Sequence, residues 1–266
     1  MNDLITVQGV VLSAMPIGEY DKRIVLLTRE RGKISAFAQG ARKLNCPYMA
    51  AANPFAFGTF TLREGKNSYN ISQVSLKHHF VELAKMQPGV YYGYYFLEIA
   101  DYFGREGTDE LEMVNLLYVT ARALLNPKLD DRLIRCVFEL RSMAIQGMMP
   151  QVFSCLQCEK DAMEQRESFF FTQKGHGILC EDCLQKLSGD IRSGQNQDQD
   201  LLYEAVRITP SALYTLQYIL QVPLEKLYSF TLTEEVLRET EGIVHSYIRR
   251  NTDRKFKSLQ ILEMMT

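Results

Sequence analysis

Residues 5–38 read ITVQGVVLSAMPIGEYDKRIVLLTRERGKISAFA, and this stretch decides the fold. It holds three runs of β-branched and apolar residues, a composition and partial alternation typical of short strands. The dipeptide Arg31-Gly32 separates the second run from the third and predicts a hairpin turn. Two later runs have the same composition, so five strands are expected. These are Ile5–Leu12, Arg23–Thr28, Lys33–Ala38, Phe55–Leu62 and Tyr69–Val74.

Five strands in about 75 residues are too few for two packed sheets and predict a small closed barrel. Gly9 and Gly58 lie inside predicted strands, where glycine often marks a bulge or a sharp bend. The OB-fold is the commonest small barrel that binds oligonucleotides, and an SH3-like barrel is the alternative.

The spacing of apolar residues changes to a helical period after Leu76. We therefore predict an α+β protein, with a barrel domain at residues 1–80 and a helical domain at residues 81–266. The polar segment Ser188–Asp200 is expected to be a mobile loop. Capping residues and prolines bound the predicted helices. These are Pro88–Phe103, Asp109–Asn126, Asp130–Gly147, Pro210–Gln221, Thr233–Arg249 and a short last segment, Lys255–Met264.

The composition is that of an ordinary globular protein: 266 residues, 46% of them hydrophobic, with a formal net charge of −2. Global disorder and collagen are thereby excluded. Charge is unevenly distributed, because residues 1–80 carry 10 Lys+Arg against 5 Asp+Glu. A local basic face that attracts phosphates is one interpretation, and a solvated surface of mixed charge is the other. Neither a secretory signal nor a membrane-spanning stretch is recognisable, which favours a cytoplasmic location.

Four cysteines form the strongest motif. Cys155-x2-Cys158 and Cys180-x2-Cys183 are separated by 21 residues, among which Phe169–Thr172 resembles one strand of a hairpin. Each pair brings two thiolates from one tight turn to a single ion, and two pairs complete the tetrahedron that Zn²⁺ favours. Four thiolates leave no open position for water. The motif therefore predicts one structural Zn²⁺ per chain, in a zinc-finger insertion at about residues 152–187.

Other interpretations of the cysteines are a rubredoxin-like iron site, buried thiols, a redox pair, or His176 in place of one ligand. Cys46 and Cys136 stand alone and are expected to be ordinary small apolar residues. The common nucleotide-binding, esterase and metalloprotease motifs are missing from the sequence, as is the His-x-Glu of zinc deaminases. We expect no enzymatic activity, with an unrecognised zinc hydrolase as the enzymatic alternative.

Lysine and arginine recur at the strand ends and loops of the predicted barrel, where such residues track nucleic-acid phosphates. The candidate DNA-binding residues are Lys22, Arg23, Arg29, Arg31, Lys33, Arg42 and Lys43. The candidate platforms for stacked bases are Phe37, Phe57, Phe60 and Tyr69, with core packing as the alternative for each. A second basic group, Arg249, Arg250, Arg254, Lys255 and Lys257, is the alternative DNA site.

Short motifs in the basic module are familiar from one family. They lie in Gly9–Leu12, Gly18–Val25, Thr28–Lys33 and Gln39–Lys43, and include Asp-x-Arg-Ile-Val and Gly-Ala-Arg. With the order of barrel, helical body and four-cysteine insertion, they resemble the RecO family of recombination mediator proteins across nearly the whole chain. The resemblance implies an N-terminal OB-fold, binding of single- and double-stranded DNA, and annealing of complementary strands. It also implies RecR and single-stranded DNA-binding protein as partners, and loading of the RecA recombinase.

The same resemblance implies a receptor for the acidic C-terminal tail of single-stranded DNA-binding protein. Such a receptor needs basic residues beside an apolar groove. Arg122, Arg132 and Arg135 are the candidates, and pairing of these arginines with nearby acidic residues is the alternative.

We therefore interpret the chain as a non-enzymatic, nucleoid-associated mediator of recombinational repair in a RecFOR-type pathway. Its expected role is to anneal strands and to help load recombinase onto single strands coated with their binding protein. The alternative is a protein-interaction scaffold whose OB-like barrel and structural zinc serve a partner protein instead of DNA. A steep salt dependence of oligonucleotide binding distinguishes the two.

Overall fold

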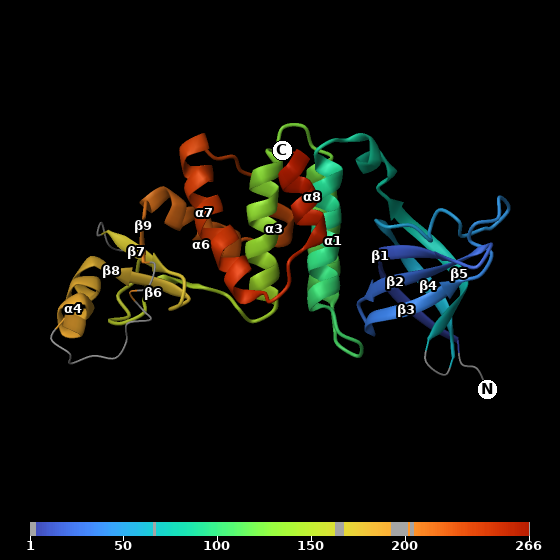
Figure 1. The fold of residues 1–266 in the computed structure, drawn as a ribbon, viewed down its shortest axis with the longest axis horizontal. Helices are drawn as coiled ribbons and strands as arrows, with labels where there is room; N and C mark the ends of the chain where they lie inside the picture. Colours follow the sequence, from blue (N-terminus) through green and yellow to red (C-terminus); the bar gives the residue numbers. More distant parts are fainter. Residues whose placement is uncertain (1–3, 66–67, 163–167, 193–201, 203–204, 266) are drawn as a thin grey trace. The chain divides into compact units, whose positions relative to one another are not determined.

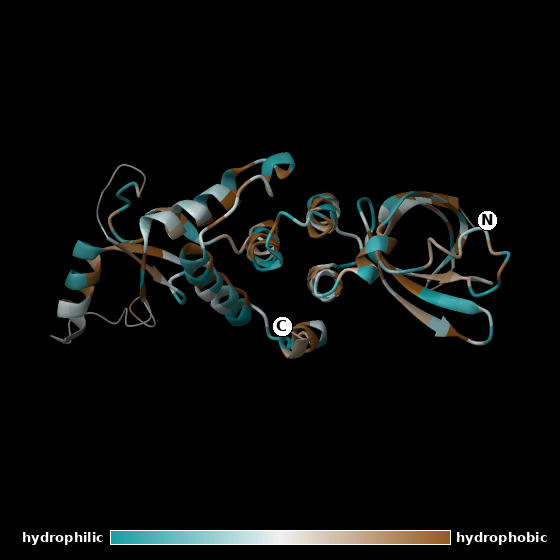
Figure 2. Cartoon of the chain, turned by 90° about the horizontal axis from the view of Figure 1, so that it is seen from above, coloured by the Kyte–Doolittle hydropathy of each residue, from teal (hydrophilic) through white to brown (hydrophobic). Residues whose placement is uncertain are grey.

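A closed five-stranded barrel forms the N-terminal part of the protein. The computed structural model describes residues 4–65, 68–162, 168–192, 202 and 205–265. The barrel has the strand order β1-β2-β3-β5-β4 and appears as a ring in Figure 2. β3 and β5 are parallel, and all other neighbours are antiparallel. The predicted five-stranded, OB-type barrel is confirmed. Its strands are β1 (Leu4–Ile17), β2 (Asp21–Thr28), β3 (Gly32–Ala38), β4 (Ala56–Glu64) and β5 (Tyr69–His79).

Alternation along the strands directs one set of side chains into the barrel. Val7 and Val11 of β1, Leu26 of β2 and Phe60 of β4 are all buried. Burial of each such side chain contributes about 1.5–3 kcal/mol to stability. β1 is longer than the predicted strand, because a bulge after Val11 lets it continue pairing with β2 as far as Ile17.

Gly9 and Gly58 face each other across the pair formed by β1 and β4. A Cβ on Gly9 would lie 2.2 Å from the carbonyl oxygen of Leu27 on β2, so only glycine permits this close approach. The pairing of β4 with β5 shifts register between Phe57 and Gly58. The two strand glycines therefore mark a close contact and a bulge, as their positions in the sequence predict.

The chain divides into two compact units, of which the first comprises Met1–Asp131 and Lys255–Thr266. Here α8 packs against α1 (Figure 1), with the ring of Phe256 edge-on to Tyr95. The Glu98 carboxylate accepts hydrogen bonds from two backbone N–H groups at the start of α8, which fixes that helix terminus. The helices of this unit are η1 (Val81–Lys85), α1 (Gly89–Phe103), α2 (Leu111–Leu124) and α8 (Lys257–Met265).

The second unit, Arg132–Arg254, contains four α-helices and a four-stranded sheet in the described residues. The sheet order is β6-β8-β7-β9, and the predicted hairpin is present as the antiparallel pair of β7 and β8. The strands are β6 (Gln151–Cys155), β7 (Phe169–Thr172), β8 (Gly177–Cys180) and β9 (Val206–Ile208). The helices are α3 (from Asp131, in the first unit, to Ile145), α4 (Glu181–Arg192), α6 (Pro210–Gln221), the short η2 (Leu224–Lys226) and α7 (Glu234–Asn251).

Two predictions about local structure are wrong. Residues 188–192 belong to α4 instead of a loop, because Cys183 and Leu187 are buried one helical turn apart and continue the apolar face. The rest of the predicted loop, residues 193–200, lies outside the described residues. The second wrong prediction is Asp109 as the residue that caps α2, because the N-cap is Glu110. Asp109 lies one residue earlier, and its Oδ1 accepts a hydrogen bond from the backbone N–H of Leu111.

The domain boundary predicted at residue 80 lies inside the first compact unit. The division into a barrel domain and a helical domain at that residue stays a prediction. Among the helices that the structure describes, none is both long and apolar enough to cross a bilayer.

Candidate functional site

The four motif cysteines converge at the ends of two parallel strands. Cys155 ends β6 and Cys180 ends β8, and these strands pair in parallel. Cys158 lies in the turn after β6, and Cys183 lies in the first turn of α4. The four Sγ atoms all lie within 4.8 Å of one another. The structure therefore brings the two cysteine pairs together around one point.

The spacing of the sulfur atoms suits a tetrahedral metal ion. The Sγ atoms of Cys158 and Cys180 are 3.8 Å apart. Four sulfurs each about 2.3 Å from a central Zn²⁺ would be separated by about 3.8 Å, which is the edge of that tetrahedron. Three of the four cysteines are buried, and Cys158 is exposed. The donor set and its geometry fit a structural zinc ion.

The thiols of this group differ in acidity. Burial raises the pKa of Cys155, but backbone N–H groups, the first of them that of Cys180, donate hydrogen bonds to its sulfur and lower the pKa to about 7. Burial raises the pKa of Cys183. Because the metal binds thiolates, its arrival must displace the protons of such thiols.

The remaining candidates for this site lie elsewhere. His176 has its Nδ1 3.1 Å from the hydroxyl of Tyr247, and it does not belong to the cysteine group. Cys136 is buried in α3 and Cys46 is half-buried in the loop after β3. Neither contributes to the group that could hold a metal ion among the described residues.

A basic group lies where the β1–β2 turn meets the loop after β3. We call Tyr20, Lys22, Arg42 and Lys43 the Tyr20 cluster. The backbone N–H of Arg42 donates to the carbonyl of Tyr20 at 2.9 Å, which holds the loop against the turn. The Lys43 ammonium lies 5.0 Å from the centre of the Tyr20 ring, within the range of a cation–π contact. Arg42, Lys43 and Tyr20 are exposed.

Lys22 supports this cluster from below its surface. Its Nζ donates to the Ala52 carbonyl at 3.1 Å and to Asn53 Oδ1 at 2.6 Å. Burial lowers the pKa of Lys22, and the nearby charge of Arg42 lowers it further. Lys22 is thus half-buried and bonded to the loop, whereas Arg42 and Lys43 project into solvent.

Two further candidates are exposed on the same barrel. Arg23 on β2 donates to the hydroxyl of Ser35 on β3 at 3.0 Å. Arg31 lies in the turn between these strands, where its carbonyl accepts a hydrogen bond from Gly107. Both side chains remain accessible to a nucleic-acid backbone.

The other two basic candidates face the helices of the first unit. Arg29 donates to Asn115 of α2 at 2.7 Å, and Lys33 forms an ion pair with Asp101 of α1 at 3.4 Å. These contacts fix the barrel against the two helices. The seven predicted residues therefore do not form one surface. Lys22, Arg42 and Lys43 lie together, and Arg23 and Arg31 are exposed on the same barrel. Arg29 and Lys33 instead contact α2 and α1.

The predicted aromatic platforms are largely parts of the core. Phe60 and Tyr69 belong to the interior of the barrel, and Phe57 packs edge-on against Tyr118 and Phe80. Phe37 is half-buried on β3. The exposed aromatic residue beside the basic cluster is Tyr20, which the sequence reasoning missed. The sequence does contain a signal for Tyr20, because this aromatic residue lies in the turn immediately before the strand that begins Asp21-Lys22-Arg23.

Two of the three candidate partner arginines have acidic neighbours. Arg132 of α3 binds Glu234 and Glu241 of α7, and Arg135 binds Glu139 one turn further along α3. Arg122 is exposed on α2, in the first unit. A tail that binds Arg132 and Arg135 would therefore have to compete with existing ion pairs.

Comparison with known proteins decides the family. The N-terminal domain model of recombination protein O matches residues 1–80, and its C-terminal domain model matches residues 89–260. The chain belongs to the RecO family. Relatives named DNA repair protein RecO match along nearly the whole chain. That of Alkaliphilus metalliredigens is 26% identical over 259 residues, covering 97% of this chain and 98% of the relative.

Two further relatives match over most of the chain or over about two thirds of it. The DNA repair protein RecO of Bacillus subtilis is 24% identical over 261 residues, covering 97% of this chain and 93% of the relative. That of Bacillus pumilus is 29% identical over 187 residues, or 69% of this chain and 70% of the relative. The family and its relatives support a role in DNA repair and recombination, and the four-cysteine group is compatible with zinc binding.

Proposed function

We propose that this RecO-family protein is a non-enzymatic mediator of recombinational DNA repair that binds single- and double-stranded DNA through its barrel. The observation that carries the proposal is the Tyr20 cluster, in which the exposed cations Arg42 and Lys43 lie beside one exposed aromatic ring on an OB-type barrel. Lysine and arginine beside a stacking ring are the usual means by which such barrels hold a nucleic-acid strand.

Arg42 and Lys43 would contact backbone phosphates, with Arg23 and Arg31 extending the track along the barrel. Tyr20 would offer a face to a base while Lys22 holds the loop in place. Contacts of this kind bind strands regardless of sequence, because they are made to the phosphates. Arg29 and Lys33 would contribute indirectly, by fixing the barrel against α2 and α1.

Annealing by this route requires no hydrolysis of a nucleotide. Two complementary strands held on one basic surface would meet while their mutual repulsion is screened. Single-stranded DNA-binding protein, through its acidic tail, and RecR would be the protein partners in the cytoplasm, and RecA loading onto the strand would follow. Arg122, Arg132 and Arg135 remain the proposed contacts for the tail.

The four-cysteine group would hold one structural Zn²⁺. The bound metal would stabilise the fold and would not take part in catalysis, because four thiolates occupy all of its coordination positions. In this role Cys155 and Cys180 tie the ends of β6 and β8 together, while Cys183 secures the start of α4.

The test of DNA binding is the dependence of oligonucleotide affinity on salt. If the barrel neutralises about four to six phosphates, the log–log slope for single strands should be about −3 to −4. Arg42→Gln with Lys43→Gln should flatten this slope by about 1.4, which corresponds to two contacts. Lys85→Gln with Lys128→Gln removes the same charge from exposed residues outside the barrel, and should leave the slope unchanged.

Normal binding and annealing by the Arg42→Gln, Lys43→Gln variant would move the DNA site, first to the basic group at Arg249–Lys257. If the parent protein itself binds oligonucleotides without salt dependence, the barrel serves a protein partner and the scaffold interpretation replaces the proposal.

A further inference from the structure

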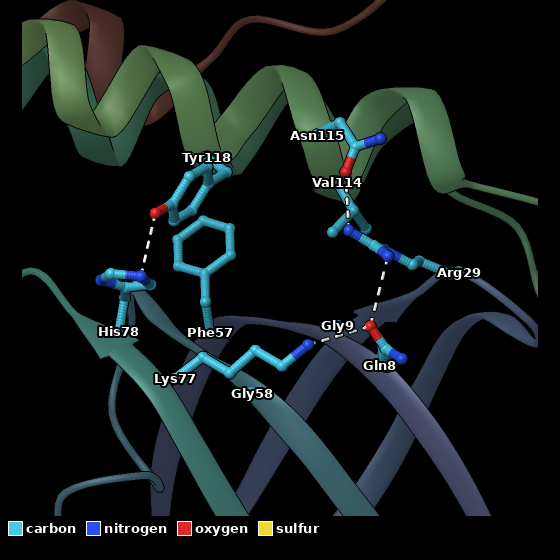
Figure 3. A pocket seen from close by; sticks show the side chains of 10 residues that line it. All are labelled: Gln8, Gly9, Arg29, Phe57, Gly58, Lys77, His78, Val114, Asn115 and Tyr118. Atoms are coloured by element: carbon cyan, nitrogen blue, oxygen red, sulfur yellow. Dashed lines mark hydrogen bonds between the residues drawn. The ribbon is translucent and has the colours of Figure 1, made fainter.

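A pocket lies between one face of the barrel and α2, within the first unit (Figure 3). We call it the α2 pocket. Its volume is about 180 Å³. It can enclose a phosphate and one side of a ring while the rest of a small ligand stays in solvent, and it is too small for an element of another protein.

One side of the α2 pocket is cationic. Arg29 donates to Gln8 Oε1 at 3.2 Å and to Asn115 Oδ1 at 2.7 Å, and Lys77 donates to the same Gln8 oxygen at 3.3 Å. These partners are uncharged amide oxygens. Arg29 Nε is buried and has no hydrogen-bond partner. The carboxylate of Glu30 reaches the backbone N–H of Gln8, but it does not line the pocket.

Two positive charges therefore share one neutral acceptor at this point. No carboxylate belongs to the described lining of the pocket. Cations held this way favour an anion, and a dianion matches two of them better than a single carboxylate does.

The other side of the pocket is aromatic. The rings of Tyr118 and His78 have centroids 5.1 Å apart, and the Tyr118 hydroxyl lies 2.9 Å from His78 Nε2. Phe57 completes this wall, with its centroid 5.5 Å from that of Tyr118. Gly9 and Gly58 line the pocket between the two sides, so that part of its lining carries no side chain. Figure 3 shows the aromatic wall at one end of the opening and Arg29 at the other, with the Lys77 side chain running below Phe57 toward Gln8.

We propose that the α2 pocket binds one nucleotide, with its phosphate at Arg29 and Lys77 and its base against the wall of Phe57, His78 and Tyr118. Base–aromatic contact tolerates any base, because every base has a π-face. The inference goes beyond the proposed function, which places the DNA strand at the Tyr20 cluster and makes no use of the α2 pocket. The nucleotide comes either from the 5′ end of a strand or from the free pool, since both present a terminal phosphate of the same charge.

The first experiment titrates the full-length protein with dTMP by calorimetry, using thymidine and inorganic phosphate as partial probes. We expect dTMP to bind at least tenfold more tightly than either part. Lys77→Gln should weaken dTMP binding about tenfold, since it removes one charge-assisted hydrogen bond from an exposed position where the fold does not depend on it. His78→Ala should weaken dTMP but not inorganic phosphate.

Lys43→Gln is the matched control, because it removes a charge from the Tyr20 cluster. It should leave dTMP affinity unchanged while it lowers oligonucleotide affinity. The proposal for the α2 pocket and the proposal for the DNA-binding surface are thereby tested independently. A strand with a 5′-phosphate should bind more tightly than the same strand without one if strand ends are the source, and Lys77→Gln should remove the difference. Equal binding of the two strands, with dTMP still bound, assigns the pocket to free nucleotides.

Several results would overturn the proposal. These are no dTMP binding at millimolar concentration, equal affinity of the parent and Lys77→Gln, or tighter binding of N-acetylphenylalanine than of dTMP. The last result would assign the pocket to a peptide carboxylate with an aromatic side chain.

Discussion

Arg132 of α3 and Glu241 of α7 form a two-pronged ion pair. Arg132 donates from Nε to Glu241 Oε1 at 3.0 Å and from Nη2 to the other carboxylate oxygen. Its Nη1 also reaches Glu234 at 3.0 Å. The hydrogen bonds that the guanidinium donates to Glu241 and Glu234 raise its pKa further, so its charge is permanent. One arginine thus ties two helices that are far apart in the sequence.

Arg132→Ala should lower the free energy of unfolding by about 1–2 kcal/mol, because the pair is bidentate and Glu241 is largely buried. Arg238→Ala is the matched control: Arg238 contacts the same Glu234, but it is exposed and within one helix, so its loss should change stability by at most about 0.5 kcal/mol. Urea denaturation measures both. Equal decreases in the free energy of unfolding would show that the ion pair between α3 and α7 contributes no more to stability than an exposed pair within one helix.

Cys158→Ser should reduce metal content from one zinc per chain and loosen the region of residues 152–187. Structural zinc contributes on the order of 10 kcal/mol to the folding of a small module. Cys46→Ser, at a cysteine outside the group, should keep the full metal content. Elemental analysis of freshly purified, reduced protein gives the answer, and iron in place of zinc would be visible as colour. Protein without any metal would contradict the zinc site.

Gly9→Ala should destabilise the barrel by several kcal/mol or prevent folding, because its Cβ would lie 2.2 Å from the backbone oxygen of Leu27. Gly242→Ala is the control in α7, where a Cβ has no atom within 4 Å, and it should stabilise the protein by about 0.5–1 kcal/mol. Thermal melts of the two variants should shift in opposite directions. A tolerated alanine at residue 9 would mean that β1 and β2 are able to move apart.

Asp131 makes stability depend on pH. Burial and the charge of neighbouring Asp130 raise its pKa to about 6. Since the folded-state pKa is the higher one, the folded chain binds more protons than the unfolded chain between about pH 4 and 6, and this carboxyl lowers stability as the pH rises through that window. Asp131→Asn should therefore stabilise the protein by about 1 kcal/mol at pH 7.5, a value reduced because the side chain is partly exposed, and should have no such effect at pH 4.

The matched variant for this prediction is Asp130→Asn, which removes the neighbouring charge and leaves Asp131 in place. It should retain the decrease in stability across the window but shift it to lower pH. Chemical denaturation at a series of pH values compares the variants with the parent. A gain for Asp131→Asn that is equal at pH 4 and pH 7.5 would attribute the effect to packing instead of ionisation.

The barrel and the cysteine group were predictable because their signals are local. Alternation at Val7 and Val11, the turn at Arg31-Gly32 and the spacing of Cys155 and Cys158 each lie within a few residues of one another. The aromatic run at Phe169–Thr172 likewise predicted a strand that the structure contains.

The roles of individual charges were not predictable, because their partners are distant in the sequence. Arg29 was expected to face DNA, but its partner Asn115 lies 86 residues later. Arg132 and Glu241 are 109 residues apart. A period or a motif contains no information about such pairs. The continuation of α4 beyond Ser188 was missed for a related reason, since the polar residues there concealed a helix whose apolar face begins at Cys183.

The packing of α8 on α1 determines when the first unit can become complete. A ribosome adds the residues of α8 only after it has made every residue of the second unit. Until then, Glu98 has no helix start to cap and Tyr95 lacks the ring of Phe256. The unit that begins synthesis first is therefore the one that finishes last, and a nascent chain stalled before Phe256 carries an uncovered aromatic face that chaperones are suited to shield.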